Sequence, residues 1–168
     1  MSVLKSMLCS SLILSLAAVI PAVQAQDLIK ARIMSLELAR DIARGTLEAC
    51  QKDGYQVAVV VTDRSGDPLV VYRDVYASKF NALLAQGKAN AVVLSTTSSA
   101  ALRANMADIK DELNELDGLF VMAGGLPIRA AGSLVGAVGV SGAPGGDKDE
   151  DCARKGIEAV ELRLEFAE

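Results

Sequence analysis

Histidine is absent from all 168 residues of this chain. Without an imidazole base the chain cannot form a Ser-His-Asp or Cys-His catalytic arrangement. The same absence excludes zinc sites built on histidine and a proximal histidine ligand to haem iron. The sequence also contains no Walker loop and no dinucleotide-binding fingerprint. These absences exclude histidine-based enzymes and metal sites and the common nucleotide-binding motifs.

Positive charge and aromatic side chains are also scarce. Lysine and arginine total 17 against 21 aspartate and glutamate residues, and the formal net charge is −4. This balance argues against nucleic acid or an anionic membrane surface as a partner. Aromatic residues make up 4% of the chain, so the core is expected to pack small side chains tightly.

Three cysteines are present, and Cys9 lies within a hydrophobic leader described below. The other two, Cys50 and Cys152, are too few for a structural zinc cluster. They could form one disulfide in an exported protein or remain two small buried side chains. The sequence leaves both alternatives open.

The only long hydrophobic run is at the start of the chain. Lys5 precedes an apolar stretch from Met7 to Ile20, and small residues follow up to Ala25. This is the pattern of a secretory signal peptide, and the run is too short to predict a membrane span. We expect cleavage near Ala25, which leaves a single domain at residues 26–168. The protein is then periplasmic or secreted, without a stable membrane anchor.

The first half of the domain alternates helices with a hairpin. Apolar spacing predicts a helix that begins after Ser35 and ends near Lys52, and another over residues 78–93. Between them, Val57–Asp63 and Leu69–Arg73 are predicted strands joined by a turn. The polar residues 95–99 should interrupt the second helix, and a shorter helix is expected from Ala100 to Asn114.

The second half contains three more predicted strands, at residues 119–123, 126–130 and 134–141, followed by a final helix. Asp147 and Glu150 have the spacing of a capping box, so the glycine-rich loop 142–146 is expected to be capped by the chain's own carboxylates. A phosphate would then be repelled. The order of elements predicts an α+β fold with a mainly antiparallel sheet flanked by helices.

Charged residues outside these elements offer few candidate sites. The densest acidic group is expected to be a solvated surface rather than a metal site; it comprises Asp108, Asp111, Glu112, Glu115 and Asp117. Asp63 and Asp67 are interpreted as turn residues. Arg73, Lys88 and Arg129 are cations that could pair with ligand carboxylates, although surface ion pairs are their default role.

Several motifs together resemble the GlcG/HbpS family. They are the segment 124–142, with Gly124-Gly125-Leu126-Pro127-Ile128-Arg129 at its start, and the segment from Asp147 through Cys152 and Ala153. The similarity extends upstream to the Val-rich strand ending in Asp63, the turn at Gly66, and Lys88-Ala89. It therefore spans most of the domain.

The resemblance implies a profilin-like three-layer domain with a five-stranded sheet, assembled into a homo-oligomer. It also implies a small-molecule ligand, which is haem or a related tetrapyrrole in some members. Other members are linked to glycolate or diol metabolism. With no histidine here, an axial iron ligand would have to be a hydroxyl such as Thr96 or Thr97, a Met, a Tyr, a Cys or water.

On this basis we predict an exported, non-enzymatic binding protein for haem or a related tetrapyrrole, acting as a scavenger or redox-sensor component. The predicted ligand-binding residues are Arg73, Lys88, Thr97, Gly124, Gly125 and Arg129. The alternative is an enzyme or enzyme accessory that acts on a small organic acid. In that alternative Arg129 and Lys88 would hold a carboxylate and Asp63 would serve as acid or base.

Overall fold

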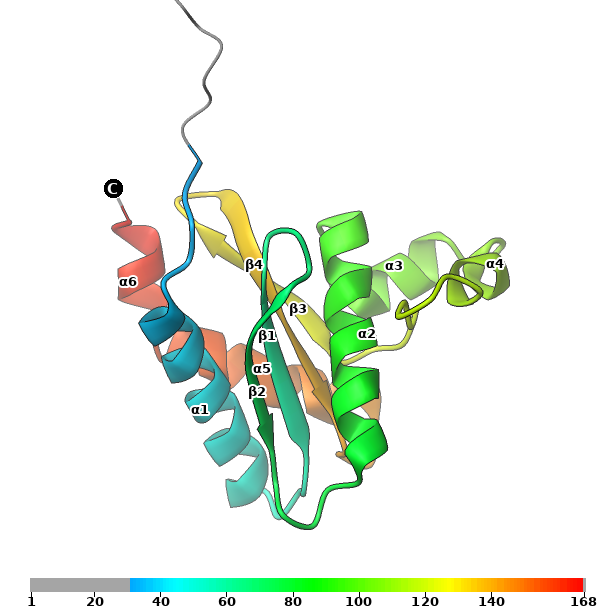
Figure 1. Ribbon diagram of the computed structural model, residues 1–168, viewed down its shortest axis with the longest axis horizontal. Coiled ribbons are helices and arrows are strands. Elements are labelled where there is room, and N and C mark those ends of the chain that lie inside the picture. The colour runs from blue at the N-terminus through cyan, green and yellow to red at the C-terminus, as the bar shows by residue number, and fades with distance from the viewer. Residues whose placement is uncertain (1–30, 168) are drawn as a thin grey trace, which may run out of the picture. The chain divides into compact units, whose positions relative to one another are not determined.

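The centre of the domain is an antiparallel sheet with strand order β2-β1-β4-β3 (Figure 1). The computed structural model describes residues 31–167, so the predicted signal peptide lies outside the described residues. The strands are β1 (Ala58–Asp63), β2 (Pro68–Arg73), β3 (Gly125–Ala130) and β4 (Ser133–Ser141). The predicted hairpin is present as β1 and β2, the predicted strands 126–130 and 134–141 pair as β3 and β4, and β1 pairs with β4 to complete the sheet.

The described part of the chain has four strands in this sheet, whereas the sequence and the family resemblance predicted five. The residues expected to form the extra strand, 119–123, are not a strand because their backbone donors bond elsewhere. Phe120 donates its N–H to the Gly87 carbonyl in the helix beside it. Val121 donates to the Asn114 side chain at 2.8 Å. This segment therefore runs along a helix instead of extending the sheet.

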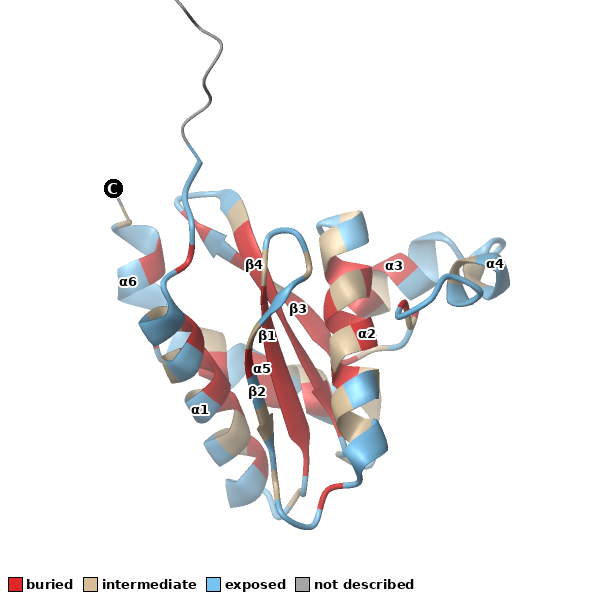
Figure 2. Cartoon of the chain, viewed as in Figure 1, coloured by how far each residue is buried: buried red, intermediate tan, exposed pale blue. Residues whose placement is uncertain are grey.

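Helices cover both faces of the sheet and form three layers (Figure 1). One face carries α1 (Leu36–Lys52) and α5 (Gly146–Glu158), followed by the short α6 (Glu161–Glu165). The other face carries α2 (Lys79–Ser95). Side chains of β4 alternate between these layers: Val138 and Val140 join the core beneath α1 and α5, while Ala137 packs with α2. The central strands β1 and β4 are consequently buried on both sides, whereas the edge strand β2 is mostly exposed or half-buried (Figure 2).

Helix α2 approaches the sheet closely because β4 is glycine-rich there. A Cβ at Gly139 would overlap the carbonyl oxygen of Ala85 in α2. Glycine removes that obstacle, so backbone of the helix and backbone of the strand come into contact. The close packing brings the next turn of α2, which carries Lys88, over the end of β4.

The predicted interruption at residues 95–99 is confirmed. Thr96 ends α2 in the left-handed conformation, with φ 57°. The Ser98 hydroxyl accepts a hydrogen bond from the Ala101 N–H and caps the next helix. The single helix expected over residues 100–114 is instead two, α3 (Ser99–Asn105) and α4 (Lys110–Asn114). The chain leaves helical geometry at Met106, which has φ −123° and ψ 41°.

Helices α1 and α5 are joined by a disulfide between Cys50 and Cys152, whose Cα atoms are 5.3 Å apart. Both cysteines are buried. The helices cross closely on small residues, since a Cβ at Gly45 would lie 3.3 Å from the Gly156 Cα. The structure thus resolves the cysteine alternative in favour of a crosslink. No helix among the described residues has the length and apolarity needed to span a membrane.

Candidate functional site

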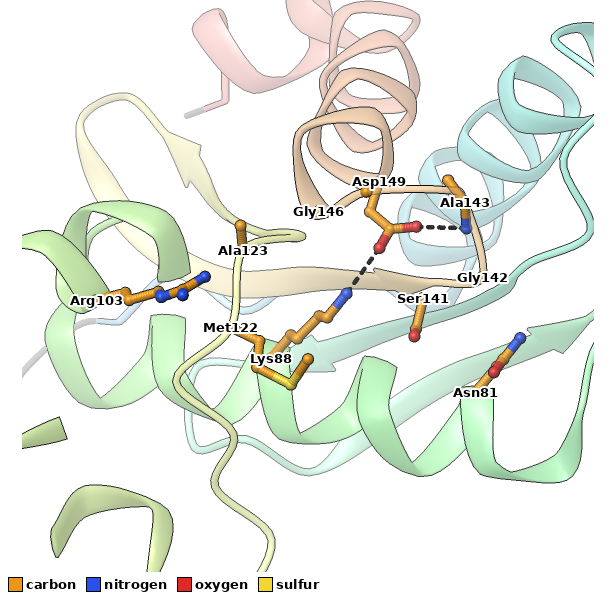
Figure 3. Close-up of a pocket in the computed structure, with 11 residues that line it drawn as sticks. Asn81, Lys88, Arg103, Met122, Ala123, Ser141, Gly142, Ala143, Gly146 and Asp149 are labelled. Carbon is orange, nitrogen blue, oxygen red and sulfur yellow. Dashed lines mark hydrogen bonds and ion pairs between the residues drawn. The ribbon is translucent and has the colours of Figure 1, made fainter. Parts of the chain in front are cut away.

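A cavity of ≈ 360 Å³ lies where α2, α3, the end of β4 and the start of α5 meet (Figure 3). Ligand pockets commonly measure about 300–1,000 Å³, so this cavity is large enough for a small molecule or for part of a larger one. Its lining combines charged, polar and small residues: Asn81, Lys88, Arg103, Met122, Ala123, Ser141, Gly142, Ala143, Gly145, Gly146 and Asp149.

A buried ion pair forms one wall of the cavity. Lys88 Nζ lies 2.7 Å from Asp149 Oδ2, and each residue is only 3% exposed. Lys88 also donates to the Val140 carbonyl at 2.8 Å. The other carboxylate oxygen of Asp149 accepts a hydrogen bond from the Ala143 N–H at 3.0 Å. The pair therefore links α2, β4, α5 and the loop between the last two.

Burial raises the pKa of Asp149 above its usual value, because removing a carboxylate from water favours its neutral form. The hydrogen bond and charge of Lys88 oppose this increase. The ion pair is thus what keeps a charged carboxylate in a buried position. A buried pair of this kind costs desolvation free energy, which only good geometry and further hydrogen bonds can offset.

The beginning of α5 differs from the sequence prediction. Gly145 is the N-cap, and no side chain caps the helix. The predicted capping box is therefore wrong: Asp147 lies in the first turn, and the Glu150 carboxylate accepts from the Gly124 N–H at 3.4 Å instead. Asp149, which lies between Asp147 and Glu150 in the sequence, is buried and paired with Lys88.

Arg103 extends toward the cavity from α3 (Figure 3). Its helix is anchored one turn earlier by Ser99, whose buried hydroxyl accepts from the Gly125 N–H at 2.9 Å. Residues four apart share a helix face, so this anchor directs Arg103 to the same side as the start of β3. Arg103 forms no ion pair or hydrogen bond with any residue that the structure describes.

Three of the six predicted ligand-binding residues lie together. Lys88 lines the cavity, and Gly124 and Gly125 lie directly against it. A Cβ at Gly124 would be 2.6 Å from Lys88 Nζ, and one at Gly125 would be 2.5 Å from the Lys88 carbonyl oxygen. These glycines make room for the lysine, and neither is among the residues that line the cavity.

The other three lie outside the cavity lining. Arg73 donates to the carbonyls of Asp74 and Ala77 in the loop after β2. Thr97 bonds to Ser95 in the turn between α2 and α3. Arg129, on β3, donates to the Thr96 carbonyl at 2.6 Å, so it stays near Thr97 rather than Lys88. All three side chains organise turns.

The carboxylates considered in the sequence also have structural explanations. Asp63 Oδ1 accepts from the N–H groups of Ser65 and Asp67 at 2.7 and 3.1 Å, which confirms its turn role. The acidic group at residues 108–117 is exposed. Within residues 31–167 no three His, Cys, Asp or Glu side chains gather as a metal site would require.

Sequence reasoning missed Arg103, Met122 and the role of Asp149. One signal was available for the last of these. Lys88 stands in the small-residue segment Gly87–Ala91 of a helix, where burial against a sheet would require a counter-charge. The sequence did not show which carboxylate supplies this counter-charge, because Asp149 is 61 residues away from Lys88.

The fold and the site together define a class of protein, which is a three-layer α+β domain with a charged cavity beside its central strands. A family model described as haem degrading protein HbpS-like matches residues 34–158. The chain therefore belongs to the HbpS-like family, which confirms the resemblance drawn from its motifs.

Solved structures agree with this assignment. A double mutant of HbpS from Streptomyces reticuli is 35% identical, with a TM-score of 0.75, covering 86% of this chain and 98% of that one. The Klebsiella pneumoniae protein ORFY is 20% identical, with a TM-score of 0.73 and coverages of 79% and 94%. A PduOC complex with haem is 24% identical, with a TM-score of 0.66 and coverages of 76% and 95%. The last two show the fold alone. A comparison with curated proteins gave no match.

Proposed function

We propose that this chain is an exported, non-enzymatic binding protein for haem or a related tetrapyrrole, serving as a scavenger or redox-sensor component. The observation that supports haem as the ligand is membership in the family described as haem degrading protein HbpS-like. A structure of the same fold, PduOC, is a complex with haem. The cavity beside Lys88 and Asp149 is the proposed position of the ligand.

The residues at the cavity fit a tetrapyrrole in two respects. Met122, 43% exposed, contributes a thioether, which is a known haem-iron ligand. Arg103 contributes a cation that has no ion-pair partner within residues 31–167, suited to a propionate carboxylate. Cys50 and Cys152 are joined in the disulfide and offer no thiolate. When bound, haem would supply a redox-active, strongly absorbing iron.

A hemin titration of residues 26–168 tests the proposal. We expect saturable binding with a shifted Soret band, and a further change in that band in Met122→Leu. Met106→Leu is the matched control, because Met106 is similarly exposed, at 41%, and lies outside the cavity lining. Absence of both saturation and a Soret shift in the unmodified protein would overturn the proposal.

Export and self-association are part of the same proposal. Export is supported by the leader in residues 1–25, and the mass of protein recovered from the expressing cell's periplasm or medium tests cleavage near Ala25.

Self-association is supported by large apolar side chains exposed around the start of α2: Val75, Tyr76, Phe80 and Leu83. Light scattering should give a multiple of the monomer mass, reduced in Phe80→Ser/Leu83→Ser. A monomeric mass before mutation would contradict it.

A further inference from the structure

Three charged side chains line the cavity, and their charges do not cancel. Lys88 and Asp149 form an ion pair at 2.7 Å and neutralise one another. Arg103 remains without a carboxylate partner among the described residues. The lining therefore has a net charge of one positive unit at neutral pH. Such a cavity favours a ligand group with one negative charge.

Hydrogen-bond donors remain for that group. An ammonium has three N–H donors, and two of those on Lys88 are directed to Asp149 and the Val140 carbonyl. One donor of Lys88 is left, together with the guanidinium of Arg103. Ser141 and Asn81 add a hydroxyl and an amide to the same lining. Two cationic donors on separate helices can each serve one oxygen of a planar carboxylate.

The acidic neighbours limit how much negative charge the cavity can accept. Asp149 is in the lining itself. Asp147 is outside the lining, and its carboxylate lies 3.8 Å from the Lys148 ammonium. Glu150 is directed to the Gly124 N–H. A phosphate dianion would bring two negative charges beside Asp149 with only one uncompensated cation, Arg103, whereas the single charge of a carboxylate would be balanced.

From these charges and donors we infer that the cavity is a subsite for a single carboxylate group, bound by Arg103 and the free N–H of Lys88. In the proposed function, on which this part of the inference rests, the carboxylate is a propionate of the tetrapyrrole. The same chemistry is present in a free small monocarboxylate. The two sources are separable by experiment.

The test compares hemin with hemin dimethyl ester, which has the same macrocycle without free carboxylates. Charge-assisted hydrogen bonds are the strong ones, so the unmodified protein should bind hemin roughly tenfold or more tightly than the ester. Arg103→Gln should remove that preference without weakening ester binding. A purely structural role for Arg103 would weaken both ligands equally. Arg40→Gln, at an exposed position on α1 outside the cavity lining, is the matched control.

Calorimetry with propanoate, propanamide and inorganic phosphate forms the second arm. We expect propanoate alone to bind, and to lose binding in Arg103→Gln. If hemin and its ester bind equally and propanoate does not bind, the subsite is refuted while tetrapyrrole binding stands. If neither porphyrin binds but propanoate binds through Arg103, the subsite stands and the proposed function fails. Binding by none of these probes overturns both.

Discussion

Lys88 is the residue on which the local structure of the site depends most. It is buried in α2, bonded to a strand carbonyl and paired with a carboxylate of α5. Gly124, just before β3, and Gly125, the first residue of β3, leave the space that it occupies. A buried ammonium without a counter-charge carries a large desolvation cost. The folding of this region and its electrostatics consequently depend on the same pair.

Removing either partner of the Lys88–Asp149 pair should lower the free energy of unfolding. We expect Lys88→Met to lower the free energy of unfolding by about 3–5 kcal/mol, because it leaves the buried Asp149 carboxylate unpaired. Asp149→Asn should have a similar effect on the ammonium. The double variant should cost clearly less than the sum of the single changes. Urea denaturation of the four proteins measures this, and additive costs would show that the pair is not coupled.

The same variant has a predicted pH dependence. Burial raises the pKa of Asp149, and Lys88→Met removes the interactions that oppose the increase. An acid whose pKa is raised by folding contributes stability below its unfolded pKa and loses it as pH rises through the folded value. The destabilisation by Lys88→Met should therefore be smaller near pH 3 than at pH 7. A cost that is independent of pH would contradict this assignment.

At the scale of elements, the contact between α2 and β4 determines where the site's lysine lies. Gly139 allows this contact because any side chain there would meet the Ala85 carbonyl. Because the atoms in contact are backbone atoms of α2 and β4, neither element can adjust by moving a side chain. The packing of one helix on one strand thus fixes the wall of the cavity.

We expect Gly139→Ala to cost about 3 kcal/mol, the upper part of the range for overpacked cores. Gly132→Ala is the control. Gly132 has φ 81° and no atom within 4 Å of an added Cβ, so the substitution should cost about 1 kcal/mol through backbone strain alone. Thermal melts of both variants test the difference. Equal shifts in melting temperature would indicate that α2 can move away from the sheet.

Most elements could be predicted from local sequence. The apolar periodicity after Ser35 and the β-branched run before Asp63 each determined an element, because the governing physics lies within a few residues. Local sequence could not exclude the extra strand at residues 119–123, because the backbone N–H groups of this segment bond to Gly87 and Asn114. Tertiary partners overrode its strand propensity.

The site was less accessible to sequence reasoning for the same physical reason. Lys88 and the two glycines that contact it, Gly124 and Gly125, were identified from motifs. Asp149 stands inside the capping-box spacing of Asp147 and Glu150, so its local sequence indicates only a helix start, whereas its actual partner, Lys88, is on another helix. Arg103 had no signal at all, because its position depends on the Ser99 contact with Gly125.

At the scale of the whole molecule, the disulfide connects the first and fifth helices across a sequence separation of 102 residues. A crosslink that closes a long loop restricts the unfolded chain and raises the relative stability of the folded state. Its presence also agrees with the proposed export, since oxidising compartments preserve such bonds.

Replacing both cysteines by alanine should lower the free energy of unfolding by about 2–5 kcal/mol. Chemical denaturation of residues 26–168, oxidised and with both alanines, measures the loss. The oxidised protein should also contain no free thiol under denaturing conditions when assayed with Ellman's reagent. Two titratable thiols in the untreated exported protein would show that the crosslink does not form.

The unpaired state of Arg103 has a consequence for altering this protein. Of the charged residues that line the cavity, Lys88 and Asp149 are buried in an ion pair, and changing either one is expected to destabilise the protein. Arg103 is exposed and carries no structural bond among the described residues. If the proposed subsite is correct, ligand preference can be redesigned through this one position on a short helix at little cost to the stability of the domain.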